Sequence, residues 1–148
     1  MNTAKREKRK SALRIFLSHT AADSAYARRL SRSLLSQRPN LRIFNTEMLS
    51  AGEDWQSKLR DELSQCDIFI VLLSPNSVYS PWVLKELGAA WGLEKPIIPV
   101  VTDPELLSRV PVSLDKARLV DVKDVDNPEV TNQILEYYEK EVDSSRNN

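Results

Sequence analysis

The chain has 148 residues, with 21 basic and 21 acidic side chains, one histidine, one cysteine and three glycines. This length suits one domain with a substantial core, and a net charge of zero supplies no global positive field to attract nucleic acid. The single cysteine, Cys66, excludes an internal disulfide, and with one histidine the chain has too few soft ligands for a zinc site. The glycines match neither a dinucleotide fingerprint nor a P-loop. We therefore expect no metal, no nucleic acid partner and no glycine-rich phosphate cradle.

Charge is unevenly distributed along the chain. Residues 1–14 contain six basic residues and one acid, whereas residues 121–148 contain eight acids and three basic residues. We expect a basic disordered arm over residues 1–12, one domain over 13–142, and a polar tail or the start of a linker over 143–148. No segment approaches the roughly 20 apolar residues of a membrane-spanning helix, and the basic start lacks the apolar stretch of a signal peptide. A cytoplasmic protein with no membrane partner is the resulting expectation.

Short apolar runs alternate with helical patterns along the chain. The predicted strands cover residues 14–18, 41–44, 68–73, 97–101 and 118–122. The predicted helices cover residues 22–35, 55 to about 66 and 80–91, with a short one after Asp103-Pro104 and a last one opened by Asn127-Pro128. This alternation is typical of an α/β fold. It predicts a flavodoxin-like, five-stranded parallel sheet of order 2-1-3-4-5 with helices on both faces.

In such a sheet, ligands bind beyond the carboxyl ends of the strands, where the strand order reverses. Those ends are residues 18–20 after the first strand and 74–77 after the third. They lack both the acidic residues of a phospho-receiver site and the hydroxyl-rich phosphate loop of a flavodoxin. A Ser–His–Asp hydrolase is also disfavoured, because no Gly-x-Ser-x-Gly turn presents a nucleophile. The fold thus predicts where a site lies, but the residues there do not match a phospho-receiver, a flavodoxin or a Ser–His–Asp hydrolase.

The helix after the third strand carries an informative pair. Trp82 and Glu86 are four residues apart and share one helix face. Because this helix starts where the strand order reverses, Glu86 can face the cleft beside an indole, which can raise a carboxyl pKa and stack on a flat base. The plainer alternative, which spacing leaves open, is a solvated Glu86 with Trp82 in the core.

Four segments together resemble a TIR (Toll/interleukin-1 receptor) domain. They are residues 14–20 (RIFLSHT), 44–55 (FNTEMLSAGEDW), 67–74 (DIFIVLLS) and 80–87 (SPWVLKEL). The resemblance covers about residues 13–142, and the short connections look more like a bacterial TIR domain than an animal receptor. Because TIR enzymes cleave NAD⁺ at the nicotinamide–ribose bond, the resemblance implies this reaction for the chain. NAD⁺ is then a substrate rather than a cofactor, and the product is either linear or cyclic ADP-ribose.

The same resemblance implies roles for individual residues. The family's catalytic glutamate corresponds to Glu86, and the loop over residues 45–54 borders the nicotinamide side of the pocket. The implied substrate-binding residues are His19, Thr20, Phe44, Asn45, Leu49, Ser77 and Trp82. The implied self-association residues are Met48, Ser50, Ala51 and Gly52.

One carboxylate is enough for this chemistry. Ordinary glycosidases need a second carboxyl group to protonate the leaving oxygen, but nicotinamide is a cation in NAD⁺ and departs neutral. An anionic Glu86 would stabilise the oxocarbenium-like ribose. We expect an NAD⁺ glycohydrolase or ADP-ribosyl cyclase, activated by self-assembly with other TIR domains, in a bacterial anti-phage effector or signal generator. A fused C-terminal sensor domain and a head-to-tail contact between the basic start and the acidic end are further expectations. The alternative is a non-enzymatic module that binds other TIR domains.

Overall fold

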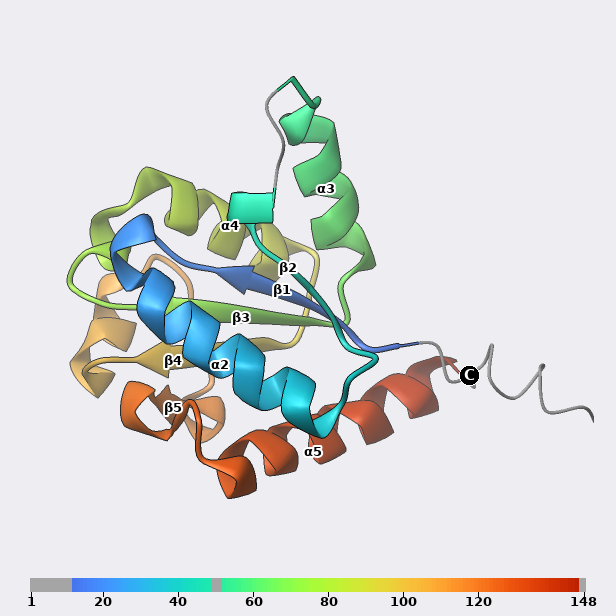
Figure 1. Cartoon of the computed structure of the whole chain (residues 1–148). Coiled ribbons are helices and arrows are strands. Elements are labelled where there is room, and N and C mark those ends of the chain that lie inside the picture. The colour runs from blue at the N-terminus through green and yellow to red at the C-terminus, as the bar shows by residue number, and fades with distance from the viewer. Residues whose placement is uncertain (1–11, 49–51, 147–148) are drawn as a thin grey trace, which may run out of the picture.

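The computed structural model describes residues 12–48 and 52–146 and contains one parallel sheet (Figure 1). All pairings between its five strands are parallel, in the order β2-β1-β3-β4-β5, which confirms the predicted fold class and topology. The strands are β1 (Arg14–Ser18), β2 (Arg42–Phe44), β3 (Ile68–Leu73), β4 (Ile97–Val101) and β5 (Val120–Asp121).

In the part of the chain that the structure describes, four α-helices cover the sheet, with α2 and α5 on one face and α3 and α4 on the other (Figure 1). Their bounds are α2 (Ser24–Gln37), α3 (Trp55–Gln65), α4 (Pro81–Gly92) and α5 (Pro128–Arg146). Every residue of β3 is buried, and alternate side chains enter two separate cores. Phe69, Val71 and Leu73 pack beneath α3 and α4, while Ile68, Ile70 and Leu72 pack beneath α2 and α5. A strand buried on both faces is apolar throughout, which explains the run IFIVLL.

The predicted helix starts follow from capping chemistry. Ser80 is the N-cap of α4: its hydroxyl accepts a hydrogen bond from the amide of Val83, and Pro81 occupies the first turn. Asp54 caps α3 in the same way through the amide of Ser57. None of the helices that the structure describes is long and apolar enough to cross a membrane.

The last strand is shorter than predicted. Asp115 caps a 3₁₀ turn, η5 (Lys116–Arg118), and Asp121 caps a second one, η6 (Val122–Asp124), so only two residues between the turns extend as β5. Side-chain oxygens of Asp compete with the sheet for backbone amides, and here they shorten the strand at both ends. At the end of the chain, α5 continues through Arg146, within the segment expected to be a tail or linker.

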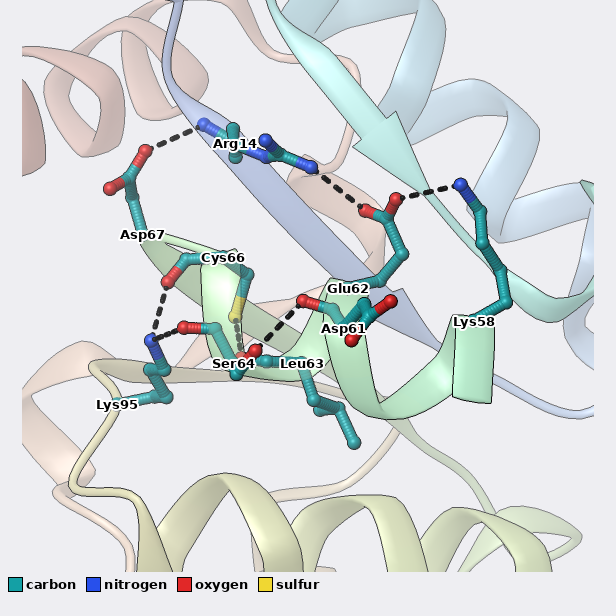
Figure 2. A network of polar contacts seen from close by, with 9 residues as sticks. All are labelled: Arg14, Lys58, Asp61, Glu62, Leu63, Ser64, Cys66, Asp67 and Lys95. Atoms are coloured by element: carbon teal, nitrogen blue, oxygen red, sulfur yellow. Dashed lines mark hydrogen bonds and ion pairs between the residues drawn. The ribbon is translucent and has the colours of Figure 1, made fainter. Parts of the chain in front are cut away.

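A polar network holds the connection between α3 and β3 (Figure 2). The ammonium of Lys95 donates to the carbonyl oxygens of Ser64 at 2.7 Å and Cys66 at 2.9 Å. The backbone amide of Arg14 donates to Asp67 at 2.8 Å, and its guanidinium reaches Glu62 at 3.4 Å. Lys95 therefore satisfies carbonyls that the end of a helix leaves without intrahelical partners.

Lys95→Met should lower the free energy of unfolding by about 1 kcal/mol, because these two carbonyls lose their charged donor. Lys58→Met is the matched control, since Lys58, whose side chain is 48% exposed, makes a helical ion pair with Glu62 that contributes about 0.5 kcal/mol or less. Urea denaturation measures both variants. Equal losses of stability in the two variants would contradict a capping role for Lys95.

Candidate functional site

The site lies where β1 and β3 end side by side and α4 begins. Ser18, the last residue of β1, pairs with Val71 of β3. Ser18 has the same strand parity as Phe16, whose side chain belongs to the core beneath α3 and α4, so the Ser18 side chain points toward α4. Its hydroxyl donates a hydrogen bond of 2.8 Å to Oε1 of Glu86. The order of the strands thus places the end of β1 next to Glu86 on α4.

The carboxyl group of Glu86 is buried, and one of its two oxygens makes a hydrogen bond. Its residue is 2% exposed, and Oε2 has no hydrogen-bond partner among the described residues. Burial raises the pKa of Glu86 to about 7, while the hydrogen bond from Ser18 acts in the opposite direction. Near neutral pH both protonation forms of Glu86 are therefore populated, and Oε2 is the buried oxygen that has no partner among the described residues.

A second buried acid joins the ends of β1 and β3. Asp23 is 4% exposed, and its Oδ2 accepts hydrogen bonds from the hydroxyls of Ser74 at 2.6 Å and Thr20 at 3.0 Å. The Ser74 hydroxyl accepts in turn from the amide of Ser77, and the Ser77 hydroxyl accepts from the amide of Ser74 at 2.8 Å. This chain of hydrogen bonds fixes the turn that leads from β3 toward α4.

Asp23→Ala should destabilise the fold by about 2 kcal/mol, because the buried hydroxyl of Ser74 and the partly buried hydroxyl of Thr20 lose their acceptor. The control is Asp126→Ala, which removes an ion pair to Arg29 whose side chains are both about half exposed and should cost about 0.5 kcal/mol or less. Chemical denaturation at pH 7 compares the variants. If Asp23→Ala were as mild as Asp126→Ala, the Asp23 network would not hold the site.

An aromatic pair lies beside the acid. The rings of Trp55 and Trp82 are 5.0 Å apart and inclined at 50°. Trp82 is partly buried one helical turn before Glu86, and Trp55 is the first residue of α3 and 42% exposed. Because Trp55 follows the loop after β2 closely, this pair connects the end of that loop to the helix that carries Glu86.

A family model described as the TIR domain matches residues 15–135, most of the chain. The chain belongs to the TIR domain family. No curated protein sequence matches it significantly.

Solved structures with this fold include two sets of TIR domains. The TIR domain of the Toll-related receptor TRR-2 from Hydra magnipapillata has a TM-score of 0.59 and 18% identity, over 85% of this chain and 97% of that one. The TIR domains of the activated Roq1 resistosome, which recognises the pathogen effector XopQ, have a TM-score of 0.57 and 19% identity, over 92% of this chain and 84% of that one. The CMP N-glycosidase BcmB of Clostridium botulinum has a TM-score of 0.51 and 17% identity, over 82% of this chain and 98% of that one. At sequence identities of 17–19%, these similarities show that the fold is shared.

Within this TIR domain, the predicted residues His19 and Thr20 directly follow Ser18, whose hydroxyl bonds Glu86. His19 follows Ser18 and is 6% exposed; its Nδ1 lies 2.8 Å from the carbonyl oxygen of Thr20. Its Nε2 is buried without a hydrogen-bond partner among the described residues. His19 Nε2 and Glu86 Oε2 are thus two buried polar atoms at this edge of the sheet that a bound ligand could satisfy.

Of three other predicted binding residues of the TIR domain, Phe44 and Ser77 are buried and Asn45 is partly exposed. Phe44 is 8% exposed and its ring lies 5.3 Å from that of Phe16, inside the core. Ser77 is fully buried within the Asp23 network. Asn45 accepts a hydrogen bond from the amide of Glu47 at 3.0 Å, which shapes the 3₁₀ turn η2 (Thr46–Met48). Substrate contacts of these three residues stay predictions.

The loop after β2 is described in part. Leu49, Ser50 and Ala51 lie outside the described residues. Gly52 has a φ of +88°, a conformation that favours glycine, and Met48 ends η2. Glu47 accepts a hydrogen bond of 2.6 Å from the hydroxyl of Ser24, which joins η2 to the start of α2. Self-association through this loop stays a prediction.

The residues that the sequence reasoning missed are Ser18, Asp23, Ser74 and Trp55. The sequence places Ser18 and Ser74 at strand ends without indicating a partner for either, and it places Trp55 in the loop motif without indicating its contact with Trp82. The burial of Asp23 is the hardest of these features to predict, because an acid at the start of a helix is ordinarily exposed. Within the described ranges, no group of three or more histidine, cysteine or acidic residues could hold a metal ion.

Proposed function

We propose that this TIR domain is an N-glycosidase that cleaves the nicotinamide–ribose bond of NAD⁺. The observation that carries the proposal is the state of Glu86: buried on α4, held by Ser18 through one oxygen, with the other oxygen unpartnered among the described residues. Perturbed carboxyl groups at a topological switch point are typical of functional sites. The shared fold of a CMP N-glycosidase supports the same class of reaction.

The bond to be broken joins C1′ of the ribose to the nitrogen of a cationic ring. Its electron pair leaves with nicotinamide, which departs neutral, so positive charge develops on the ribose. An ionised Glu86 stabilises that charge, and it does so strongly because the carboxylate is withdrawn from water. Water then forms a new bond to C1′ and releases a proton to solvent, giving ADP-ribose. Attack by the bound adenine in place of water would give a cyclic product.

The cationic ring itself favours the reactive form of the enzyme. A positive charge placed near a carboxyl group lowers its pKa, so bound NAD⁺ shifts Glu86 toward the carboxylate before the bond breaks. Trp82 and the loop after β2 border the nicotinamide, and the unpartnered Nε2 of His19 is available to a ribose or phosphate oxygen. Ser18 fixes the orientation of the carboxyl group.

We further propose that copies of the domain assemble through the loop that contains residues 48–52, in a bacterial anti-phage effector or signal generator. A non-enzymatic TIR interaction module is the second candidate. It is favoured by Trp91 and Leu93 at the end of α4, which are 53% and 51% exposed. Large apolar side chains that a surface leaves exposed are common at protein interfaces.

Incubation of concentrated wild-type protein with NAD⁺, with nicotinamide followed by chromatography, separates the two candidates. The N-glycosidase releases nicotinamide together with ADP-ribose or a cyclic product, and CMP tested in parallel reports whether the site accepts another nucleotide. If neither NAD⁺ nor CMP loses its base, even in crowded solutions that promote assembly, the interaction module replaces the enzyme.

A further inference from the structure

A cavity of about 500 Å³ lies beside α5, where the starts of β4 and β5 meet the turn η5. Its apolar wall includes Ile98, Leu119, Val130 and Ile134, and its polar groups include Arg118 and Tyr138. Glu86 lies on α4, whereas Ile98 and Tyr138 belong to the core beneath α2 and α5, so the cavity is separate from the candidate active site. Its volume is in the range of pockets that hold small molecules.

Tyr138 contributes a buried donor without an acceptor. The residue is 3% exposed, and its buried hydroxyl finds no acceptor for its proton among the described residues. The adjacent guanidinium of Arg118, with Cζ 5.4 Å from the centre of the Tyr138 ring, has only donors to offer. Burial raises the pKa of Tyr138 to about 12, so the hydroxyl keeps its proton at neutral pH. The proton of this hydroxyl therefore requires an acceptor from outside the described chain.

Arg118 adds a cation with spare bonding capacity. Its Nε lies 3.6 Å from a carboxylate oxygen of Asp115, whose side chain is 59% exposed. A guanidinium carries five N–H donors, and a single long ion pair leaves others available. Arg118 also lies over the ring of Tyr137, with Cζ 6.0 Å from its centre, so that stacking holds the guanidinium at the edge of the cavity.

We propose that this cavity binds a small carboxylic acid with a flat apolar body, whose carboxylate accepts from Arg118 and from the Tyr138 hydroxyl. The carboxylate supplies an acceptor for the Tyr138 hydroxyl and a second anionic partner for Arg118, which already pairs with Asp115 of the cavity lining. The apolar body fits the wall of branched aliphatic side chains from β4, from Leu119 after η5, and from α5. Binding there would brace η5 against α5, and it requires no catalytic activity of Glu86.

Amide resonances of the full chain, followed by NMR during titration with 3-phenylpropanoate, test the proposal. We expect saturable shifts in η5 and α5, and binding about tenfold weaker for the neutral 3-phenylpropanamide, which lacks the charge. Absence of saturable shifts up to about 10 mM acid, or equal affinity for the acid and the amide, would overturn it.

Two tyrosine variants test whether the Tyr138 hydroxyl donates a hydrogen bond to the bound acid. Tyr138→Phe should weaken binding of the acid about tenfold, whereas the matched variant Tyr137→Phe, which keeps its ring and loses a half-exposed hydroxyl, should bind as the wild type does. Without ligand, Tyr138→Phe should be at least as stable as the wild type, because the hydroxyl it loses has no acceptor. Full affinity in Tyr138→Phe would remove the Tyr138 hydroxyl from the site and, with it, the argument for an acid.

Discussion

Glu86→Gln should be stabilised relative to the wild-type chain, and the difference should grow by about 2–3 kcal/mol from pH 5 to pH 8. Burial raises the pKa of Glu86 from 4.5 in the unfolded chain to about 7 in the folded one. Between these values the folded state holds a proton that the unfolded state has lost, so raising the pH disfavours folding. Above pH 7 the full cost of a buried carboxylate is present, and glutamine avoids it.

Urea denaturation at pH 5 and pH 8 measures this difference. Any effect of glutamine on the free energy of unfolding that does not depend on pH cancels when the two values are subtracted. Glu94→Gln, an exposed change just beyond α4, is the matched control and should follow the wild-type pH dependence. If Glu86→Gln and the wild type lost stability in parallel, the carboxyl group would not be perturbed in the folded chain.

The second large effect concerns the pH profile of nicotinamide release, and it depends on the proposed function. The ionised form of Glu86 is the active one, so kcat/KM should rise roughly 30-fold between pH 5.5 and pH 8 and level off above pH 7. Ser18→Ala removes the hydrogen bond that lowers the pKa of Glu86. The rising limb of this variant should therefore move to higher pH, with the largest loss of activity near pH 6.

Steady-state kinetics from pH 5.5 to 9 check both statements. The exposed hydroxyl of Ser36 bonds a carbonyl within α2, and Ser36→Ala should leave the profile in place. A profile without a limb near pH 7, or a limb that moves to lower pH in Ser18→Ala, would contradict a role for ionised Glu86 tuned by Ser18.

Local chemistry explains why so much of the fold could be predicted. A fully apolar run specified β3, and the Ser80-Pro81 pair specified the start of α4, because each signal is complete within a few residues. These two elements locate the strand end and the helix that carries Glu86. The pair of Trp82 and Glu86 on one helix face could also be predicted, since helical spacing fixes it.

Contacts across the sheet could not be predicted in this way. Both Phe16 and Leu17 are buried, so the sequence of β1 does not show which face Ser18 shares with α4. Asp23 resembles an ordinary acid at a helix start until Ser74, 51 residues away, supplies its partner. The shortening of β5 similarly depends on how Asp115 and Asp121 use their side chains.

The proposed cleavage of an N-glycosidic bond by the Glu86 carboxylate is tested by nicotinamide release from NAD⁺ with Glu86→Gln, compared with the wild type and Glu94→Gln. All three proteins are compared at pH 8, at equal and high concentration, after their folding has been verified. We expect Glu94→Gln to match the wild type and Glu86→Gln to lose at least about 100-fold in rate, the loss typical of removing a principal electrostatic group. Equal release by Glu86→Gln and the wild type would contradict the claim.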